Sequence, residues 1–493
     1  MGLSYEPILF TKDELVNITK GSWLQNEPKN ISVKGLFISP ALYNPQHVFI
    51  ATGGFSVKKR KDYVIQTLKK GVVLAIIDEE IDDIPNWCSV LLVENTQKAL
   101  EELSYFAREK SLAKIIAITG SVGKTSIKDT LCKVLSTQGT TFGSYQSVNG
   151  GVGLKNQLAL LPENIDFGVF EIGMLGPNSI KPRSKYIKPN VALINSIAPA
   201  HIKHHSDIKS IVKTKTDIIY GLEENGTVII PMDSEFYNDI NSICKEYNKN
   251  INIVTFGENV DSDCRLLSYT QNEIGSFVKA IILGEEIEYN IGISGKFWIL
   301  NTIAILACIK LIGANISKAA QTFEFLEPSL RRGERFRVEL DDNNIIELID
   351  DTFNANPASM KSAIELLNER TKLKNGRKIL VIGDMEELGD DEVKYHTDLN
   401  SIIEKTDIDL VLTVGEKMKY LYEKLSSNKK LYHTDDSIQM SEKLNKIVLN
   451  GDLILVKGSN KTSMNKIINK FISNKREQFK APIKWTLEKE LKN

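Results

Sequence analysis

Short apolar runs, many of them rich in β-branched residues, alternate along the chain with stretches whose apolar residues recur at helical spacing. Such a run predicts a strand buried on both faces, and a helical spacer between two runs predicts a parallel connection. The sequence therefore predicts an α/β protein with parallel sheets. The predicted strands are VVLAIID (72–78), KIIAITG (114–120), FGVFEIGM (167–174), VALINSI (191–197), TVIIP (227–231), KILVIGD (378–384), LVLTVGE (410–416) and LILVKGS (453–459).

The predicted strands fall into three groups, and we expect three domains. A chain of 493 residues is too long for one ordinary hydrophobic core. We expect a first domain at 1–108, closed by the helical stretch TQKALEELSYFAREKSLA, a central domain at 109–327 and a last domain at 328–493. The second boundary falls in FLEPSLRRGERF, where a proline, a glycine and clustered charges interrupt the periodicity.

The segment IIAITGSVGKTSIKDTLCKVL joins a predicted strand to a predicted helix through a glycine-containing turn. Its G-x-x-G-K-T core lets backbone N–H groups approach phosphate oxygens, while the lysine adds positive charge and the threonine offers a hydroxyl to Mg²⁺. The longer form of this motif has a glycine where this chain has Thr119. An ordinary glycine-rich turn does not account for the Lys-Thr pair, so we predict a nucleotide phosphate site. It comprises Gly120, Ser121, Val122, Gly123, Lys124, Thr125 and Ser126.

Composition and charge restrict the partners. The chain has 62 basic and 63 acidic residues, so no net field attracts nucleic acid or a membrane surface. Its five cysteines are widely spaced without a C-x-x-C pair, which is typical of reduced thiols. The N-terminus lacks a basic start followed by a long apolar run, and no segment approaches 18 uninterrupted apolar residues. We expect a cytoplasmic protein with small-molecule substrates, without nucleic acid or membrane insertion.

Further motifs occur in a characteristic order, and together they resemble the Mur ligases over roughly residues 110 to 465. The string DDTFNANPASM is long enough to be highly specific. The resemblance implies three domains, a central P-loop ATPase domain and a Rossmann-like C-terminal domain, and it implies an ADP-forming amide ligase that uses ATP and Mg²⁺. The motifs are TGSVGKTS (119–126), SVNGGVGL (147–154), FEIGM (170–174), NSIAPAH (195–201), IDDTFNANPASM (349–360), GDMEELG (383–389) and VKGS (456–459).

A set of Mg²⁺ ligands is predicted beside the phosphate site. Glu171 ends a predicted strand, so its carboxylate would project from the carboxyl edge of the sheet, where it can hold Mg²⁺. The resemblance implies that His201 helps hold a second Mg²⁺, although a lone histidine is also typical of a structural residue. Lys215 matches a lysine that these ligases often carry as a carbamate, with Lys213 as the alternative alignment. The predicted metal ligands are Thr125, Glu171, His201 and Lys215, and the predicted catalytic residues are Lys124, Glu171, His201 and Lys215.

The resemblance implies an adenine contact in the central domain. Asn301 follows SGKFWIL, at the position where the family's asparagine meets adenine. Phe297 and Trp298 lie just before it, and either ring could stack on the base or pack in the core.

Contacts from the last domain are implied as well. Arg332, in RRGERF, resembles the family arginine that reaches the nucleotide from the interdomain hinge, and a planar guanidinium suits phosphate. Asp350, Asp351, Asn354 and Asn356 belong to a polar turn closed by Pro357, which the resemblance assigns to ribose and phosphate contacts made when the domains close. Asp350 and Asn354 are the predicted nucleotide contacts. Lys457 and Ser459, in VKGS, are implied to contact the amine substrate.

Two alternatives remain for the substrates. The nearest pattern within the family belongs to ligases that add D-alanyl-D-alanine to the UDP-N-acetylmuramoyl tripeptide in peptidoglycan synthesis. The usual S-T-D-S-R segment of the first domain is absent, and GLFISPALYNPQHVFIATGG (35–54) stands in its place. The chain is therefore either a divergent enzyme of that kind, which we favour, or a ligase joining an amino acid or amine to a different carboxylate in a specialised pathway.

A protein that binds nucleotide without turnover belongs to a different class. Such a protein is expected to have lost Glu171, Lys215 or the Asp350 turn, and this chain keeps all of them. A GTPase is disfavoured because SNKT (459–462) is not the N-K-x-D signal for guanine. The family expectation is a monomer.

Overall fold

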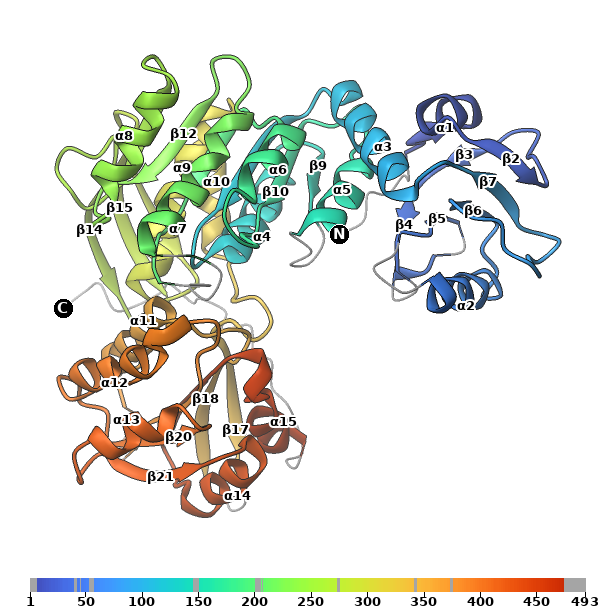
Figure 1. Cartoon of the computed structure of the whole chain (residues 1–493). Helices are drawn as coiled ribbons and strands as arrows, with labels where there is room; N and C mark the ends of the chain where they lie inside the picture. Colours follow the sequence, from blue (N-terminus) through green and yellow to red (C-terminus); the bar gives the residue numbers. More distant parts are fainter. Residues whose placement is uncertain are drawn as a thin grey trace.

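The computed structural model describes residues 7–39, 42–44, 46–52, 57–144, 150–199, 205, 207–272, 275–340, 344–372 and 376–473. Three large sheets organise this part of the chain, and they follow one another along the sequence (Figure 1). Figure 1 shows the N-terminal and C-terminal units as separate bodies that both adjoin the central one. None of the helices in the described ranges combines the length and apolarity needed to span a bilayer.

The N-terminal unit contains a five-stranded sheet in the order β2-β7-β6-β5-β4 and a two-stranded β1-β3 pair. Strands β4 to β7 are parallel, and β6 is buried along its whole length, as expected for a strand covered on both faces. The elements are β1 (Phe10–Thr11), α1 (Lys12–Thr19), β2 (Ser22–Gln25), β3 (Ser32–Val33), β4 (Leu36–Phe37), β5 (Val48–Ile50), α2 (Val57–Leu68), β6 (Leu74–Ile77), β7 (Ser89–Leu92) and α3 (Thr96–Lys110).

The central unit contains a nine-stranded sheet in the order β16-β15-β14-β13-β12-β11-β8-β10-β9. It is parallel from β9 to β14, and β14, β15 and β16 form an antiparallel meander at one edge. The elements are β8 (Lys114–Thr119), α4 (Lys124–Leu135), β9 (Thr141–Gly143), α5 (Gly151–Ala159), β10 (Phe167–Glu171), α6 (Ile180–Ile187), β11 (Val191–Ile194), α7 (Ile208–Thr216), η3 (Asp217–Gly221), β12 (Thr227–Pro231), α8 (Tyr237–Tyr247), β13 (Asn252–Gly257), β14 (Cys264–Gln271), β15 (Ser276–Ile282), β16 (Glu285–Ile291), α9 (Lys296–Leu311) and α10 (Ile316–Phe323).

The C-terminal unit contains a six-stranded sheet in the order β17-β18-β22-β19-β20-β21, parallel except for β17. Helices cover both faces and bury two separate apolar clusters. The elements are β17 (Glu334–Glu339), β18 (Ile345–Asp351), α11 (Pro357–Glu369), β19 (Lys378–Gly383), η5 (Gly389–Asp391), α12 (Glu392–Ile403), β20 (Leu410–Val414), α13 (Met418–Lys424), β21 (Lys430–Thr434), α14 (Ser437–Ile447), β22 (Leu453–Lys457), η6 (Asn460–Thr462) and α15 (Asn465–Ser473).

Every apolar run that the sequence predicts as a strand contains a strand of the structure. The predicted domain boundaries lie outside the sheets: α3 spans the first boundary and ends at Lys110, and β17 begins at Glu334, after the second. The boundaries themselves stay a prediction.

A buried arginine joins α3 to the central unit. Arg108 donates from Nε to the carbonyl of Ile187 at 2.7 Å and from Nη2 to that of Lys188 at 2.7 Å. Its Nη2 also lies 2.9 Å from Glu223 Oε1, and the residue is only 7% exposed. Burial lowers the pKa of Arg108, and the Glu223 carboxylate opposes this effect. The N-terminal unit is thus tied to the central unit through charge-assisted bonds shielded from water.

Replacing Arg108 with alanine is expected to weaken this joint. The change removes a charged donor from two carbonyls, which we expect to cost about 2–3 kcal/mol. That corresponds to a melting temperature lower by roughly 4–10 °C, measured by differential scanning calorimetry. Lys361→Ala is the control because it breaks only an exposed ion pair with Glu365 on α11, and it should leave the melting temperature nearly unchanged. Equal losses in both variants would contradict the role of Arg108.

Candidate functional site

The G-x-x-G-K-T segment forms a loop between β8 and α4. Gly120 and Gly123 adopt positive φ angles of 153° and 83°. Gly123 is the N-cap of α4, and no side chain caps this helix end. Lys124 folds back over the loop and donates from Nζ to the carbonyl of Gly120 at 2.8 Å. The uncapped N-terminus of α4, its dipole and a lysine therefore converge on one place, which is the arrangement that binds phosphate.

Residues that follow β11 form one wall of this loop. Ser121 N donates to the Ser196 carbonyl at 2.8 Å, and Val122 N donates to Ser196 Oγ at 3.0 Å. Asn195 Nδ2 donates to the Val122 carbonyl at 3.1 Å. The sequence analysis quoted this segment as a motif without assigning a function to Asn195 or Ser196. Their position directly after a buried strand, beside the strand that precedes the loop, was the available signal.

Gly123 lies against the start of α9. A Cβ atom at Gly123 would lie 2.7 Å from Asn195 Nδ2 and 2.8 Å from Phe297 Cζ. Asn301 is 2% exposed and accepts from Asn195 Nδ2 at 3.1 Å, whereas its own buried Nδ2 has no hydrogen-bond partner in the described chain. A buried donor without a partner fits a ligand acceptor. Trp298 packs against the central core, so of the two rings only Phe297 lies on the loop.

A hydroxyl and a carboxylate meet at the carboxyl edge of the sheet. Thr125 Oγ1 donates to Glu171 Oε2 at 2.8 Å, and both residues are buried. Burial lowers the pKa of Lys124, although the nearby Glu171 carboxylate raises it in part. These hard oxygens fit Mg²⁺. No group of three or more His, Cys, Asp and Glu that could hold a metal occurs in the described ranges.

Lys215 lies buried in the last turn of α7. It is 1% exposed. Burial, reinforced by the charge of Lys124, lowers the pKa of Lys215 well below its ordinary value. Lys213 is exposed on the same helix, so only Lys215 has the environment of a neutral amine. His201 lies outside the described residues.

Arg332 crosses from the interdomain linker to the loop. Its Nη2 donates to Thr125 Oγ1 at 3.2 Å, and its guanidinium carbon lies 3.9 Å from the centroid of the Phe353 ring. Burial lowers the pKa of Arg332, and the carboxylates of Glu171 and Asp351 act in the opposite direction. The linker before the C-terminal unit thus places a guanidinium beside the Thr125 hydroxyl, which is bonded to the Glu171 carboxylate.

The polar turn after β18 faces the loop as well. Asn356, which caps α11, donates from Nδ2 to the Ser121 carbonyl at 3.5 Å, the outer limit of a hydrogen bond. Asn354 is exposed beside it, and its Oδ1 accepts from Ala355 N at 2.9 Å. Asn354 and Asn356 therefore lie where the C-terminal unit approaches the phosphate loop.

The two adjacent acids of this turn have different surroundings. Asp350 is 4% exposed, and its Oδ1 accepts from Thr352 N at 3.0 Å and from Thr352 Oγ1 at 2.6 Å. Asp351 pairs with Lys457 Nζ at 2.7 Å, and Lys457 also donates to the Asn354 carbonyl at 3.0 Å. The sequence analysis placed both acids in this turn and chose Asp350 as the contact, whereas Asp351 is the acid that pairs with Lys457. The alternation of side chains along a strand was the signal that could have distinguished the two.

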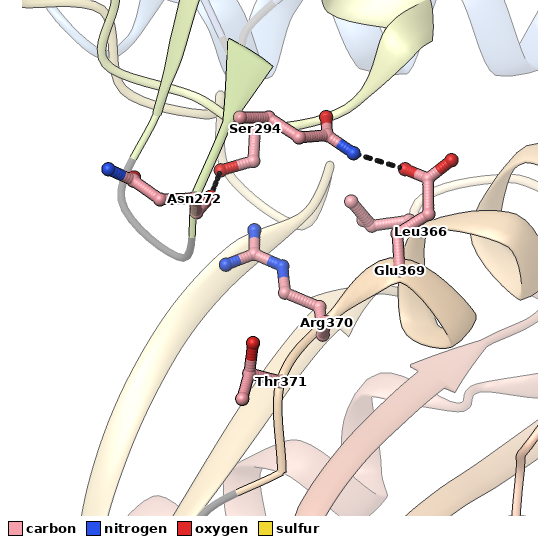
Figure 2. Close-up of a pocket in the computed structure, with 7 residues that line it drawn as sticks. Asn272, Ser294, Leu366, Glu369, Arg370 and Thr371 are labelled. Atoms are coloured by element: carbon pink, nitrogen blue, oxygen red, sulfur yellow. Dashed lines mark hydrogen bonds between the residues drawn. The ribbon is translucent and has the colours of Figure 1, made fainter.

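A small cavity separates the central and C-terminal units away from the loop (Figure 2). Gln271, at the end of β14, donates from Nε2 to Glu369 Oε2 on α11 at 2.8 Å. Ser294 donates to the carbonyl of Asn272 at 2.5 Å beside it. The cavity measures about 60 Å³, far below the size of ordinary ligand pockets. We therefore describe this region as a contact between domains; its lining also includes Leu366, Arg370 and Thr371.

Comparison with known proteins identifies relatives over almost the whole chain. Residues 118–309 match the Mur ligase middle domain, and residues 334–460 match the Mur ligase glutamate ligase domain. The chain is 31% identical over 409 residues to the UDP-N-acetylmuramoyl-tripeptide--D-alanyl-D-alanine ligase of Buchnera aphidicola subsp. Acyrthosiphon pisum, covering 79% of this chain and 83% of that one. It is 27% identical over 465 residues to the Bacillus subtilis ligase of the same name, covering 94% of this chain and 98% of that one.

Solved structures share the fold. The crystal structure I of MurF from Acinetobacter baumannii superposes with a TM-score of 0.81 at 24% identity, covering 94% of this chain and 99% of that chain. MurF from Thermotoga maritima in complex with ADP superposes with a TM-score of 0.72 at 22% identity, covering 89% of this chain and 97% of that chain. The predicted α/β fold with the three-domain Mur ligase architecture is confirmed.

The fit of Gly123 into the loop can be tested with alanine. Gly123→Ala should lower nucleotide affinity at least about tenfold, because a Cβ would overlap Asn195 and Phe297 and the phosphate-binding N–H groups would shift. Gly284→Ala is the matched control, since Gly284 has a nearly equal φ of 81° and nothing within 4 Å of its Cβ position. Both variants carry the same backbone strain. Isothermal titration with ADP and Mg²⁺ should show a loss for Gly123→Ala alone, and equal affinities would contradict the loop geometry.

Proposed function

The chain belongs to the Mur ligase family, and on that premise we propose that it is an ATP-dependent, ADP-forming ligase that adds D-alanyl-D-alanine to the UDP-N-acetylmuramoyl tripeptide in peptidoglycan synthesis. The observation that carries this proposal is that the Bacillus subtilis ligase with this name aligns over 94% of the chain. Nucleotide binding is supported by the loop geometry of Gly123 and Lys124. A monomeric state and a cytoplasmic location stay predictions.

In this proposal the phosphates of ATP lie on the loop. The N–H groups at the start of α4 and the Lys124 ammonium face the phosphates, and Arg332 adds a second cation from the linker. Thr125 and Glu171 would hold Mg²⁺, together with Lys215 as a carbamate and His201. When bound, the metal would offset the charge that develops between the phosphates.

The reaction that follows needs no covalent intermediate on the protein. The substrate carboxylate attacks the γ phosphorus and ADP leaves, which produces an acyl phosphate. The amine then attacks the acyl carbon, phosphate leaves, and an amide remains. Lys124 and Arg332 stabilise the negative charge of the transferring phosphoryl group, because fixed cations in a buried site are already oriented for it.

Closure of the C-terminal unit onto the central unit would control the reaction. Arg332 and the Asn356 turn reach the loop from the linker and the C-terminal unit, whereas the loop itself belongs to the central unit. Catalysis by positioning requires both sets of groups in place at once. We therefore propose that substrates bind before the two units adopt the reactive arrangement.

Direct assay of the reaction is the first test. We expect phosphate release only with ATP, Mg²⁺, UDP-N-acetylmuramoyl tripeptide and D-alanyl-D-alanine together, and a product mass increased by the dipeptide minus water. Lys124→Ala should reduce release at least about 100-fold because the phosphoryl group loses its cation. Lys114→Ala is the control, since Lys114 is exposed on the strand that precedes the loop. Full release by Lys124→Ala would exclude the proposed site.

A second candidate function is a ligase for a different carboxylate. The observation that favours it is the segment 35–54, which replaces the usual S-T-D-S-R of the first domain. Protein that binds ADP normally but releases no phosphate with the muramoyl tripeptide would support this candidate over the first.

The Lys215 carbamate can be observed directly. Only a neutral amine attacks CO₂, and the lowered pKa of Lys215 keeps its amine neutral at a pH where an ordinary lysine is charged. We expect a carbamate carbon signal with ¹³C-bicarbonate by NMR, lost as the pH falls through the pKa of Lys215. Lys215→Arg should lose the signal and lower kcat by about 10- to 100-fold, whereas the exposed Lys213→Arg control should keep both. An active wild-type protein without the signal would contradict the carbamate.

A further inference from the structure

Adjacent arginines of the linker bond to different domains. Arg332 donates from Nη2 to Thr125 Oγ1 of the phosphate loop at 3.2 Å. Arg331 bonds to the C-terminal unit instead: its Nε donates to Thr352 Oγ1 at 3.1 Å, and its Nη2 donates to the Thr352 carbonyl at 2.8 Å and to Asn460 Oδ1 at 3.2 Å. The side chains of two adjacent linker residues therefore form hydrogen bonds with different units, although Arg332 also stacks on the Phe353 ring of the C-terminal unit.

The backbone of Arg331 is strained. Its φ of 61° lies in the left-handed region, which is disfavoured for any residue with a Cβ and which glycine adopts freely. Gly333, two residues later, also has a positive φ, of 87°. A strained conformation persists where surrounding contacts determine it, and here three hydrogen bonds of the guanidinium supply those contacts.

The partner of Arg331 is itself fixed by a buried acid. Thr352 has no exposed surface, and its hydroxyl donates to Asp350 Oδ1 at 2.6 Å. Because that hydrogen is used, the Thr352 oxygen is left to accept from Arg331 Nε at 3.1 Å. Asp350, Thr352 and Arg331 thus form a continuous chain of hydrogen bonds from the interior of the C-terminal unit to the linker.

We propose that Arg331 is a positioning residue that fixes the linker to the C-terminal unit and thereby places Arg332 at the phosphate loop. This inference rests on the proposed function, in which Arg332 meets the nucleotide. Without the Arg331 side chain, the linker is still held by the bonds from Phe353 N to the Arg331 carbonyl and from Gly333 N to the Asp350 carbonyl. It has fewer restraints, however, so the fraction of molecules with Arg332 beside Thr125 falls. The loop still binds nucleotide in those molecules, so the loss concerns the reaction more than the binding.

Glycine at position 331 changes the side chain and the backbone together, so a second glycine variant is needed to distinguish the two effects. Arg331→Gly relieves the strained φ and deletes the three hydrogen bonds. We expect kcat to fall about tenfold with the KM for ATP within about threefold of wild type, and Arg331→Lys to recover part of kcat. Leu330→Gly is the control, because Leu330 is 72% exposed and its substitution adds the same backbone freedom without removing a hydrogen bond. Wild-type kcat in Arg331→Gly would overturn the proposal.

A second measurement does not depend on turnover. Spin labels at Lys245→Cys on α8 and Lys394→Cys on α12, both exposed positions, report the distance between the two units. We expect a broader distance distribution in Arg331→Gly than in wild type or Leu330→Gly. An unchanged distribution overturns the role of Arg331 even if the wild type is an active ligase. If Arg331→Gly broadens the distance distribution but the wild-type protein has no ligase activity, the positioning role of Arg331 is supported and the proposed function is rejected.

Discussion

The concentration of positive charge around one carboxylate is the interaction on which the site depends. Lys124 and Arg332 are held where burial lowers their pKa values, and their charges are opposed by Glu171. The structure thus brings cations together where water shields them poorly, an arrangement that favours anionic ligands. The glycine loop and the N-terminus of α4 add donors with the same preference. A nucleoside triphosphate bound with Mg²⁺ would supply negative charge to balance these cations.

The two joints of the central unit differ in kind. On the N-terminal side, the buried Arg108 bonds to carbonyls of the central unit and to Glu223, so the joint is stabilised in a medium where such bonds are strong. On the C-terminal side, the contacts between described residues include the Gln271–Glu369 hydrogen bond, the long Asn356–Ser121 contact and the bond from Arg332. Because fewer buried bonds join the C-terminal unit to the central unit, we expect domain closure at this joint and not at the N-terminal one.

Local patterns predicted much of the framework. Each apolar run became a strand because parallel strands covered by helices must be apolar on both faces. No apolar run predicts a strand in the segment 233–290. Strands β14, β15 and β16 form an antiparallel meander there with one face directed away from the core, so polar residues interrupt the apolar pattern. The two acids at the end of β18 were also hard to distinguish, because Asp350 and Asp351 are neighbours in sequence. Side chains alternate along a strand, so Asp350 is buried while Asp351 faces Lys457.

The sequence by itself determined the α/β class, the phosphate loop and the family, because strand periodicity and a glycine-lysine-threonine turn are properties of short segments. Only the tertiary structure decided which groups meet. Lys215 and Lys213 are equivalent in sequence, yet packing buries one and exposes the other. Arg331 and Arg332 are adjacent and identical, yet a left-handed backbone directs one to Thr352 and the other to Thr125. Such choices depend on contacts between residues far apart in the chain, which no local pattern encodes.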